Sequence, residues 1–113
     1  MEIRSNRYTY IIAPLSEKLD RYEASRIEAE IKNESREVAI DLNYVKDCSI
    51  EFIETLKKLT NTKTIGIFNI PSDIFVLFNI MNVDKLVKLY ASELDFKSSQ
   101  RQLINRQFKL VQT

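Results

Sequence analysis

The sequence has 113 residues and contains no histidine, one glycine and one cysteine. Without histidine, Cys–His catalysis, Ser–His catalysis and histidine ligation of metals are excluded. Because Gly66 is the only glycine, a glycine-rich phosphate-binding loop is excluded as well. These absences favour a binding or regulatory protein that is not an enzyme and needs no cofactor.

The sequence also lacks a long apolar run, a secretory signal and a strong excess of one charge. No apolar run reaches the ~18 residues of a membrane span, and residues 1–8 are too polar for a secretory signal. The 17 basic residues nearly balance the 16 acidic ones, which argues against direct nucleic-acid binding. The single cysteine, Cys48, has no intrachain disulfide partner, which fits a reducing cytoplasm. We therefore expect a cytoplasmic protein.

Strand and helix patterns alternate along the chain. Runs of β-branched, aromatic and other apolar residues predict four strands, over 8–14, 37–42, 64–68 and 86–91. Apolar residues at helical spacing predict three helices between them, over 19–33, 49–59 and 72–81. This order predicts an α/β fold, in which covering helices pack on a mostly parallel sheet of four to five strands.

Polar residues mark the predicted helix ends. Asp20, with Glu23 three positions later, predicts the start of the first helix. Ser72, directly after Pro71, is the predicted cap of the third helix. Asn82 is predicted to end that helix, because asparagine tolerates the left-handed conformation of a helix terminus.

Four segments carry a resemblance to a known family: EKLDRYEAS (17–25), VAIDLNYV (38–45), FNIPSDIF (68–75) and MNVDKLVKLY (81–90). Each pattern is degenerate alone. Their order and spacing, over roughly residues 8–91, resemble the STAS domain, the fold of bacterial anti-sigma factor antagonists. The resemblance predicts a STAS-like domain over residues 1–96.

The resemblance implies a protein that acts in transcription regulation by association. Its partner would be an anti-sigma factor with serine kinase activity or another STAS-type protein, and a homodimer is a further option. In this family, phosphorylation of a serine at the start of the second helix breaks the complex. The alternative is a structural subunit of a larger assembly, either a stress-signalling complex or a lipid-transport ATPase.

The switch motif of the family is altered in this chain. Where the family has I-D-S-S-G-L, this sequence has V-K-D-C-S-I-E-F. Three registers place Cys48, Ser49 or Ile50 at the phosphorylated serine. Helix phase favours Ser49 or Ile50, because the register on Cys48 places Glu51 and Thr55 in the core. The glycine of the motif is absent in every register, which predicts a degenerate or lost phosphoserine switch.

The candidate partner-binding residues at this turn are Asp47, Cys48, Ser49 and Ile50. Ser49 is the candidate phosphorylation site, although a helix cap alone is the simpler interpretation. Cys48 is interpreted as a small, half-buried turn residue more readily than as a nucleophile or redox sensor. Asp47, Glu51 and Glu54 lack a further ligand at a clear spacing, so a solvated acidic face is expected and not a metal site.

The third helix is apolar nearly all round. Its predicted core stripe consists of Ile74, Leu77, Phe78 and Met81. Val76 then points away from the core and Phe75 lies at the border, which indicates a docking surface for a partner. The alternative is that the C-terminal tail covers them through Leu103, Ile104 and Phe108.

Residues 97–113 form a basic C-terminal extension. The segment carries four cations and no acid: Lys97, Arg101, Arg106 and Lys109. A terminal helix and an added strand are both compatible with its pattern. Because four charges without an interleaved aromatic pattern are a weak signal, a solvated extension is favoured over a contact with nucleic acid or membrane.

Overall fold

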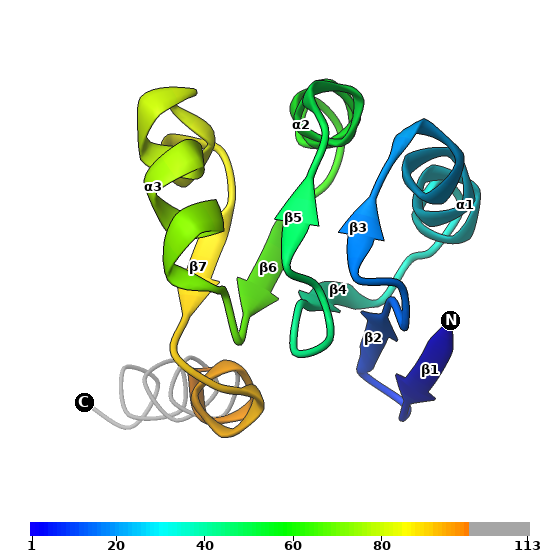
Figure 1. Ribbon diagram of the computed structural model, residues 1–113. Helices are drawn as coiled ribbons and strands as arrows, with labels where there is room; N and C mark the ends of the chain where they lie inside the picture. Colours follow the sequence, from blue (N-terminus) through cyan, green and yellow to red (C-terminus); the bar gives the residue numbers. More distant parts are fainter. Residues whose placement is uncertain (100–113) are drawn as a thin grey trace.

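The computed structural model describes residues 1–99 and contains a five-stranded sheet with the order β1-β2-β4-β6-β7 (Figure 1). Its strands are β1 (Glu2–Ser5), β2 (Thr9–Ala13), β4 (Glu37–Asp41), β6 (Ile65–Phe68) and β7 (Lys88–Tyr90). The last four strands are parallel to one another, and β1 pairs antiparallel with β2. The predicted α/β fold with a mostly parallel sheet is therefore confirmed.

Three helices cover one face of this sheet (Figure 1). They are α1 (Arg21–Ile31), α2 (Ile50–Leu59) and α3 (Ser72–Ile80), and a short 3-10 helix, η1 (Val83–Lys85), precedes β7. Each helix links two successive parallel strands, as right-handed crossover units require. Residues 93–99 are also helical and lie on the other side of the sheet (Figure 1).

The main core lies between the sheet and the three helices. The apolar stripe predicted for α2 is confirmed, because its four members are all buried: Phe52, Ile53, Leu56 and Leu59. The strands β4 and β6 are buried on both faces, which explains their continuous apolar pattern in the sequence.

The only glycine makes room for an aromatic side chain on the opposite face of the sheet. Phe96, from the helix at 93–99, is buried there and stacks on Phe68 with a ring-centroid distance of 6.1 Å. A Cβ atom at Gly66 would lie 3.0 Å from the ring of Tyr90 and 3.3 Å from that of Phe96. Gly66 therefore serves the packing of the sheet, and not a phosphate loop.

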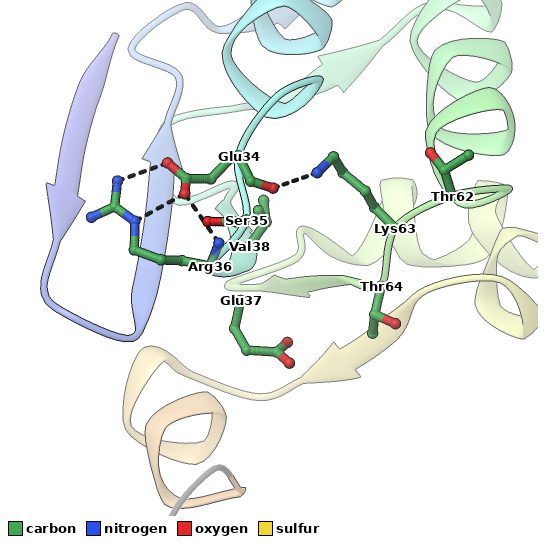
Figure 2. Close-up of a pocket in the computed structure, with 8 residues that line it drawn as sticks. All are labelled: Glu34, Ser35, Arg36, Glu37, Val38, Thr62, Lys63 and Thr64. Carbon is green, nitrogen blue, oxygen red and sulfur yellow. Dashed lines mark hydrogen bonds and ion pairs between the residues drawn. The ribbon is translucent and has the colours of Figure 1, made fainter.

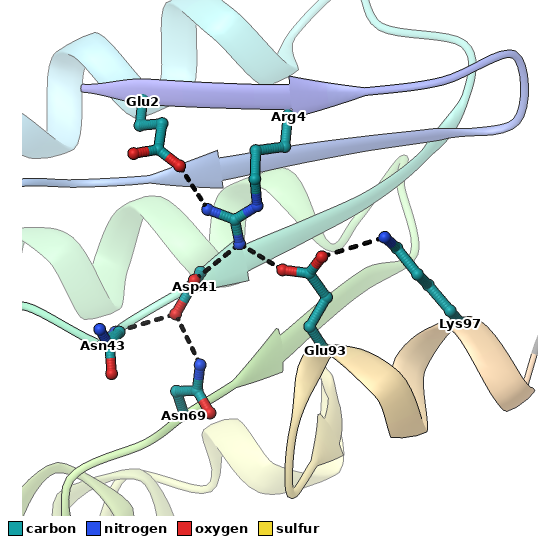
Figure 3. Close-up of polar contacts among 7 residues, drawn as sticks. All are labelled: Glu2, Arg4, Asp41, Asn43, Asn69, Glu93 and Lys97. Carbon is teal, nitrogen blue, oxygen red and sulfur yellow. Dashed lines mark hydrogen bonds and ion pairs between the residues drawn. The ribbon is translucent and has the colours of Figure 1, made fainter.

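A polar cluster ties the first strand to the last described helix (Figure 3). The Arg4 guanidinium donates to Glu2 at 2.8 Å and to the buried carboxylate of Asp41 at 2.7 Å, and it also pairs with Glu93. Asp41 accepts a further hydrogen bond from the Asn69 side chain at 3.0 Å. Asp41 is thus buried with its hydrogen-bonding capacity used, which removes most of the cost of burying a charge.

Two of the three helix-end predictions are confirmed and one is wrong. Asp20 caps α1 by accepting a hydrogen bond from Glu23 N–H at 3.0 Å, and Asn82 adopts a left-handed conformation with φ 61°. Ser72 does not cap α3. The chain enters α3 one residue earlier, because the Pro71 carbonyl accepts the first helical hydrogen bond from Phe75 N–H at 2.9 Å.

The N-terminal and C-terminal segments add elements that the sequence did not predict. The strand β1 was missed because its four residues are mostly polar and exposed. The helix at 93–99 crosses the boundary predicted between residues 96 and 97. Residues 100–113 lie outside the described part of the chain, so the helix or strand expected there stays a prediction. Within residues 1–99, no helix is both long enough and apolar enough to span a bilayer.

Candidate functional site

Two short parallel strands place the starts of α1 and α2 side by side (Figure 1). They are β3 (Lys18–Leu19) and β5 (Asp47–Cys48). Asp47 N–H donates to the Glu17 carbonyl at 3.1 Å, and Ser49 N–H donates to the Leu19 carbonyl at 2.9 Å. The predicted switch turn is therefore held in a defined position beside the start of the first helix.

Ser49 occupies the N-cap position of α2. Its hydroxyl oxygen accepts a hydrogen bond from Phe52 N–H at 3.3 Å, while Ile50 is the first helical residue and is exposed. The backbone amides of the first helical turn have no partner within the helix, so an added phosphate group would meet favourable donors there. The nearby carboxylates of Asp47 and Glu51 would oppose it.

Replacing Ser49 by alanine is expected to lower the free energy of unfolding by about 1 kcal/mol, because the cap of α2 is lost. Urea denaturation measures this change. Ser49→Asn is the matched control, since asparagine also caps helices, and it should stay close to wild type. Equal stability of all three proteins would show that the hydroxyl does not cap the helix.

Cys48 is buried and points into the core. Its side chain is 7% exposed, and it belongs to the main hydrophobic cluster. Burial, and to a lesser degree the negative charge of Asp47, raises the pKa of the Cys48 thiol from 9.0 to about 11. The thiolate is therefore scarce at neutral pH, which disfavours a nucleophilic or redox role.

The raised pKa predicts slow alkylation of Cys48 in the folded protein. At pH 8 we expect iodoacetamide to react at least about 100-fold more slowly with folded protein than with urea-unfolded protein, from the difference of two pKa units. Because the folded pKa is above the unfolded one, the associated stability is present below pH 9.0 and is lost as the pH rises towards about 11. Comparable labelling rates, measured by mass spectrometry, would contradict the burial of this thiol.

The helix α3 presents its predicted stripe to the core and leaves apolar side chains outside. Ile74 and Phe78 are buried, whereas Phe75 and Val76 are 44% and 54% exposed. Ile80, one turn after Val76, is 69% exposed and was not predicted. The spacing of four residues between Val76 and Ile80 would have revealed it, because such positions share a helix face.

The exposed apolar residues come from neighbouring segments, because α3 contacts β5 directly before the start of α2. We name as the α2–α3 surface the exposed residues Tyr44, Ile50, Phe75, Val76 and Ile80. Tyr44 lies in the loop between β4 and β5 and was also not predicted. Exposed large apolar side chains on neighbouring segments are candidates for contact with a binding partner.

A shallow hollow adjoins this surface at the end of the sheet. It has a volume of about 290 Å³ and is lined by Ile70, Phe75, Leu89, Tyr90 and Ala91. Its walls are mostly apolar and carry no ionisable side chain other than the phenol of Tyr90. The hollow suits the side chain of a binding partner better than the chemistry of a reaction.

A second hollow, of about 230 Å³, lies at the amino ends of β4 and β6 (Figure 2). The Glu34 carboxylate pairs with Arg36 at 2.7 Å, and the Glu34 carbonyl accepts from Lys63. The hydrogen bonds from Arg36 lower the pKa of Glu34 to about 2. Since Arg36 and Lys63 already have partners, this hollow joins two loops and offers no free cation for an anionic ligand.

The acidic residues near Ser49 do not converge. Among residues 1–99, no group of three or more cysteine, aspartate or glutamate side chains is placed to hold a metal ion. Glu51 and Glu54 are exposed on α2, and Asp47 is exposed before it. Glu51 and Glu54 face α1 instead, where they line a hollow between α1 and α2 together with the cations Arg21 and Lys58.

Three solved structures have the same architecture. A STAS domain protein from Planctomyces limnophilus aligns with a TM-score of 0.68 and 18% identity, covering 82% of this chain and 90% of that one. A structure described as an anti-sigma factor antagonist from Thermotoga maritima aligns with a TM-score of 0.71 and 14% identity, covering 88% of this chain and 93% of that one. The anti-sigma factor antagonist SpoIIAA, in its unphosphorylated form, aligns with a TM-score of 0.66 and 10% identity, covering 89% of this chain and 96% of that one.

The chain has a STAS-like fold. The resemblance seen in the four sequence segments is thereby confirmed at the level of structure. No protein-family model and no curated protein matches the sequence. At 10–18% identity, the shared feature is the STAS-like arrangement of strands and helices and not the sequence of the site.

Proposed function

We propose that this protein is a non-enzymatic regulatory module that binds an anti-sigma factor with serine kinase activity. The observation that carries the proposal is the α2–α3 surface, where exposed apolar side chains lie beside the start of α2 on a STAS-like fold. The apolar centre would supply the binding energy, since buried apolar and aromatic anchors dominate most interfaces. The carboxylate of Asp47, which is exposed in β5 directly before α2, would favour a basic group on the partner.

The site chemistry supports binding over catalysis. The thiol of Cys48 is buried with a raised pKa, and the hydroxyl of Ser49 is used as a helix cap. Neither side chain has a histidine beside it to act as a general base, because the chain contains none. A surface that recognises a partner therefore accounts for more of these residues than a reaction would.

We further propose that regulation by a phosphoserine is degenerate or absent. Ser49 is the N-cap residue of α2, and a phosphate there would meet free backbone amides. However, Asp47 lies two residues before it, Glu51 two residues after it, and the glycine of the family motif is replaced. A partner would thus bind whether or not a kinase acts on Ser49.

Affinity capture from the native cell, followed by mass spectrometry, tests the proposed partner. We expect recovery of an anti-sigma factor or a related serine kinase, bound to the full chain. Incubation of the recovered complex with ATP, followed by mapping of residues 47–53, should show little or no phosphate on Ser49. Capture of neither a kinase nor an anti-sigma factor would contradict the proposal. Stoichiometric recovery with a transporter ATPase or a large stress complex would favour a structural subunit instead.

A further inference from the structure

Within residues 1–99, the strand β1 ends the sheet, and no described strand pairs with its outer edge. In the hairpin between β1 and β2, Asn6 N–H donates to the Thr9 carbonyl at 3.0 Å. Hydrogen-bonded pairs alternate along antiparallel strands, so Arg4 and Glu2 form the next bonded pairs with β2. The N–H and C=O groups of Ile3 and Ser5 therefore point outward, away from β2. An edge of this kind is a template for another strand.

The residues of β1 are complementary to themselves. If β1 pairs antiparallel with a second copy about Ile3, then Glu2 of each copy lies opposite Arg4 of the other. Pairs of opposite charge across strands are stabilising. A shift to the next register that the outward groups allow would place Arg4 opposite Arg4, or Glu2 opposite Glu2. Charge thus selects one register among those available to the backbone.

We propose that β1 pairs with β1 of a second copy of this chain, in the antiparallel direction and centred on Ile3. The two sheets then form one continuous sheet across a two-fold axis. Ile3, which is 39% exposed, meets its counterpart on the helix-covered side, and Glu2 and Arg4 pair on the other side. The side chains of Glu2 and Arg4 are 48% and 34% exposed, so both are accessible to a second copy.

The opposite edge of the sheet is less suited to this pairing. The strand β7 has three residues, and it carries Lys88, which is exposed. An exposed lysine on an edge strand is a common protection against pairing. Because β1 and β7 are at opposite ends of the strand order, the proposed dimer leaves α3 and the α2–α3 surface open. The inference is thus independent of the proposed function.

Sedimentation equilibrium of the full chain over a wide concentration range tests the proposal. We expect wild type to reach the mass of two copies. Ser5→Pro removes an outward N–H without removing a bond to β2, and it should leave a monomer. Glu2→Arg replaces two attractive pairs by two repulsive ones and should raise the dimer dissociation constant at least about tenfold. Glu54→Arg, the same charge change on the exposed side of α2, should alter it less than about twofold.

Circular dichroism of each variant establishes that the fold is retained. If Ser5→Pro fails to fold, the comparison of Glu2→Arg with Glu54→Arg decides the question. A wild-type monomer at the highest attainable concentration would overturn the proposal. A dimer that is unaffected by Glu2→Arg would overturn it equally, because the contact would then lie elsewhere on the molecule.

Discussion

Val76→Glu is expected to weaken binding of the captured partner at least about 30-fold, which corresponds to the ~2 kcal/mol of an interface hot spot. Val76 is 54% exposed at the centre of α3, between Phe75 and Ile80 on the same surface. A carboxylate placed there would lose its hydration in the complex, which costs binding free energy unless a cation or hydrogen-bond donor pairs with it. Titration calorimetry with the purified partner measures the change.

The folded state of this variant should be nearly unaffected. Val76 does not belong to the buried core, and substitutions at such surface positions usually change the free energy of unfolding by less than about 0.5 kcal/mol. Ser25→Glu is the matched control, since it adds the same charge to an exposed position on α1, which lies across α2 from α3 (Figure 1). If Val76→Glu and wild type bind the partner with equal affinity, α3 is not part of the binding surface.

Phe96→Ala is expected to lower the free energy of unfolding by about 3 kcal/mol, as is typical when a buried phenylalanine is truncated. The Phe96 ring is 1% exposed, and it contacts Phe68 and, edge to face at 5.4 Å, Tyr90. Its removal would leave a cavity above Gly66, which has no side chain to fill it. Urea denaturation with constant m value measures the loss.

The control for this prediction lies on the same helix. Leu94 is 69% exposed, so Leu94→Ala should change stability by less than about 0.5 kcal/mol. A loss below about 1 kcal/mol for Phe96→Ala would mean that the helix at 93–99 contributes little to the domain. A loss of the expected size would show that the helix at 93–99 packs on the domain through Phe96.

The parallel core of the fold was predictable because its patterns are long and regular. The strands β4 and β6 read as continuous apolar runs, and the buried stripe of α2 follows helical spacing over its full length. Such patterns reflect the burial of whole faces, which local sequence encodes directly. The order of strands and helices then leaves few topologies.

The short elements were not predictable in the same way. The strands β3 and β5 have two residues each, so they have no periodicity, and only pairing between distant segments defines them. The helix at 93–99 did have a local signal. Ser92 accepts a hydrogen bond from Asp95 N–H at 3.2 Å, in the pattern of a helix cap followed by an acid three positions later.

The candidate site was predicted in part. Ser49 was correctly identified as a helix cap, and Phe75 and Val76 are exposed as expected. Tyr44 was missed because exposure in a loop depends on which neighbours cover the side chain, and the sequence does not give those neighbours. Ile80 had a local signal, since it lies one helical turn after Val76.

Hydrogen–deuterium exchange of the full chain, alone and in complex with the captured partner, tests whether the α2–α3 surface binds that partner. We expect slower exchange on binding in the loop between β4 and β5, in the first turn of α2 and along α3. We expect no change in α1 or in the loop that joins α1 to β4. Protection confined to those latter segments, with none in α3, would contradict the assignment of the α2–α3 surface as the binding site.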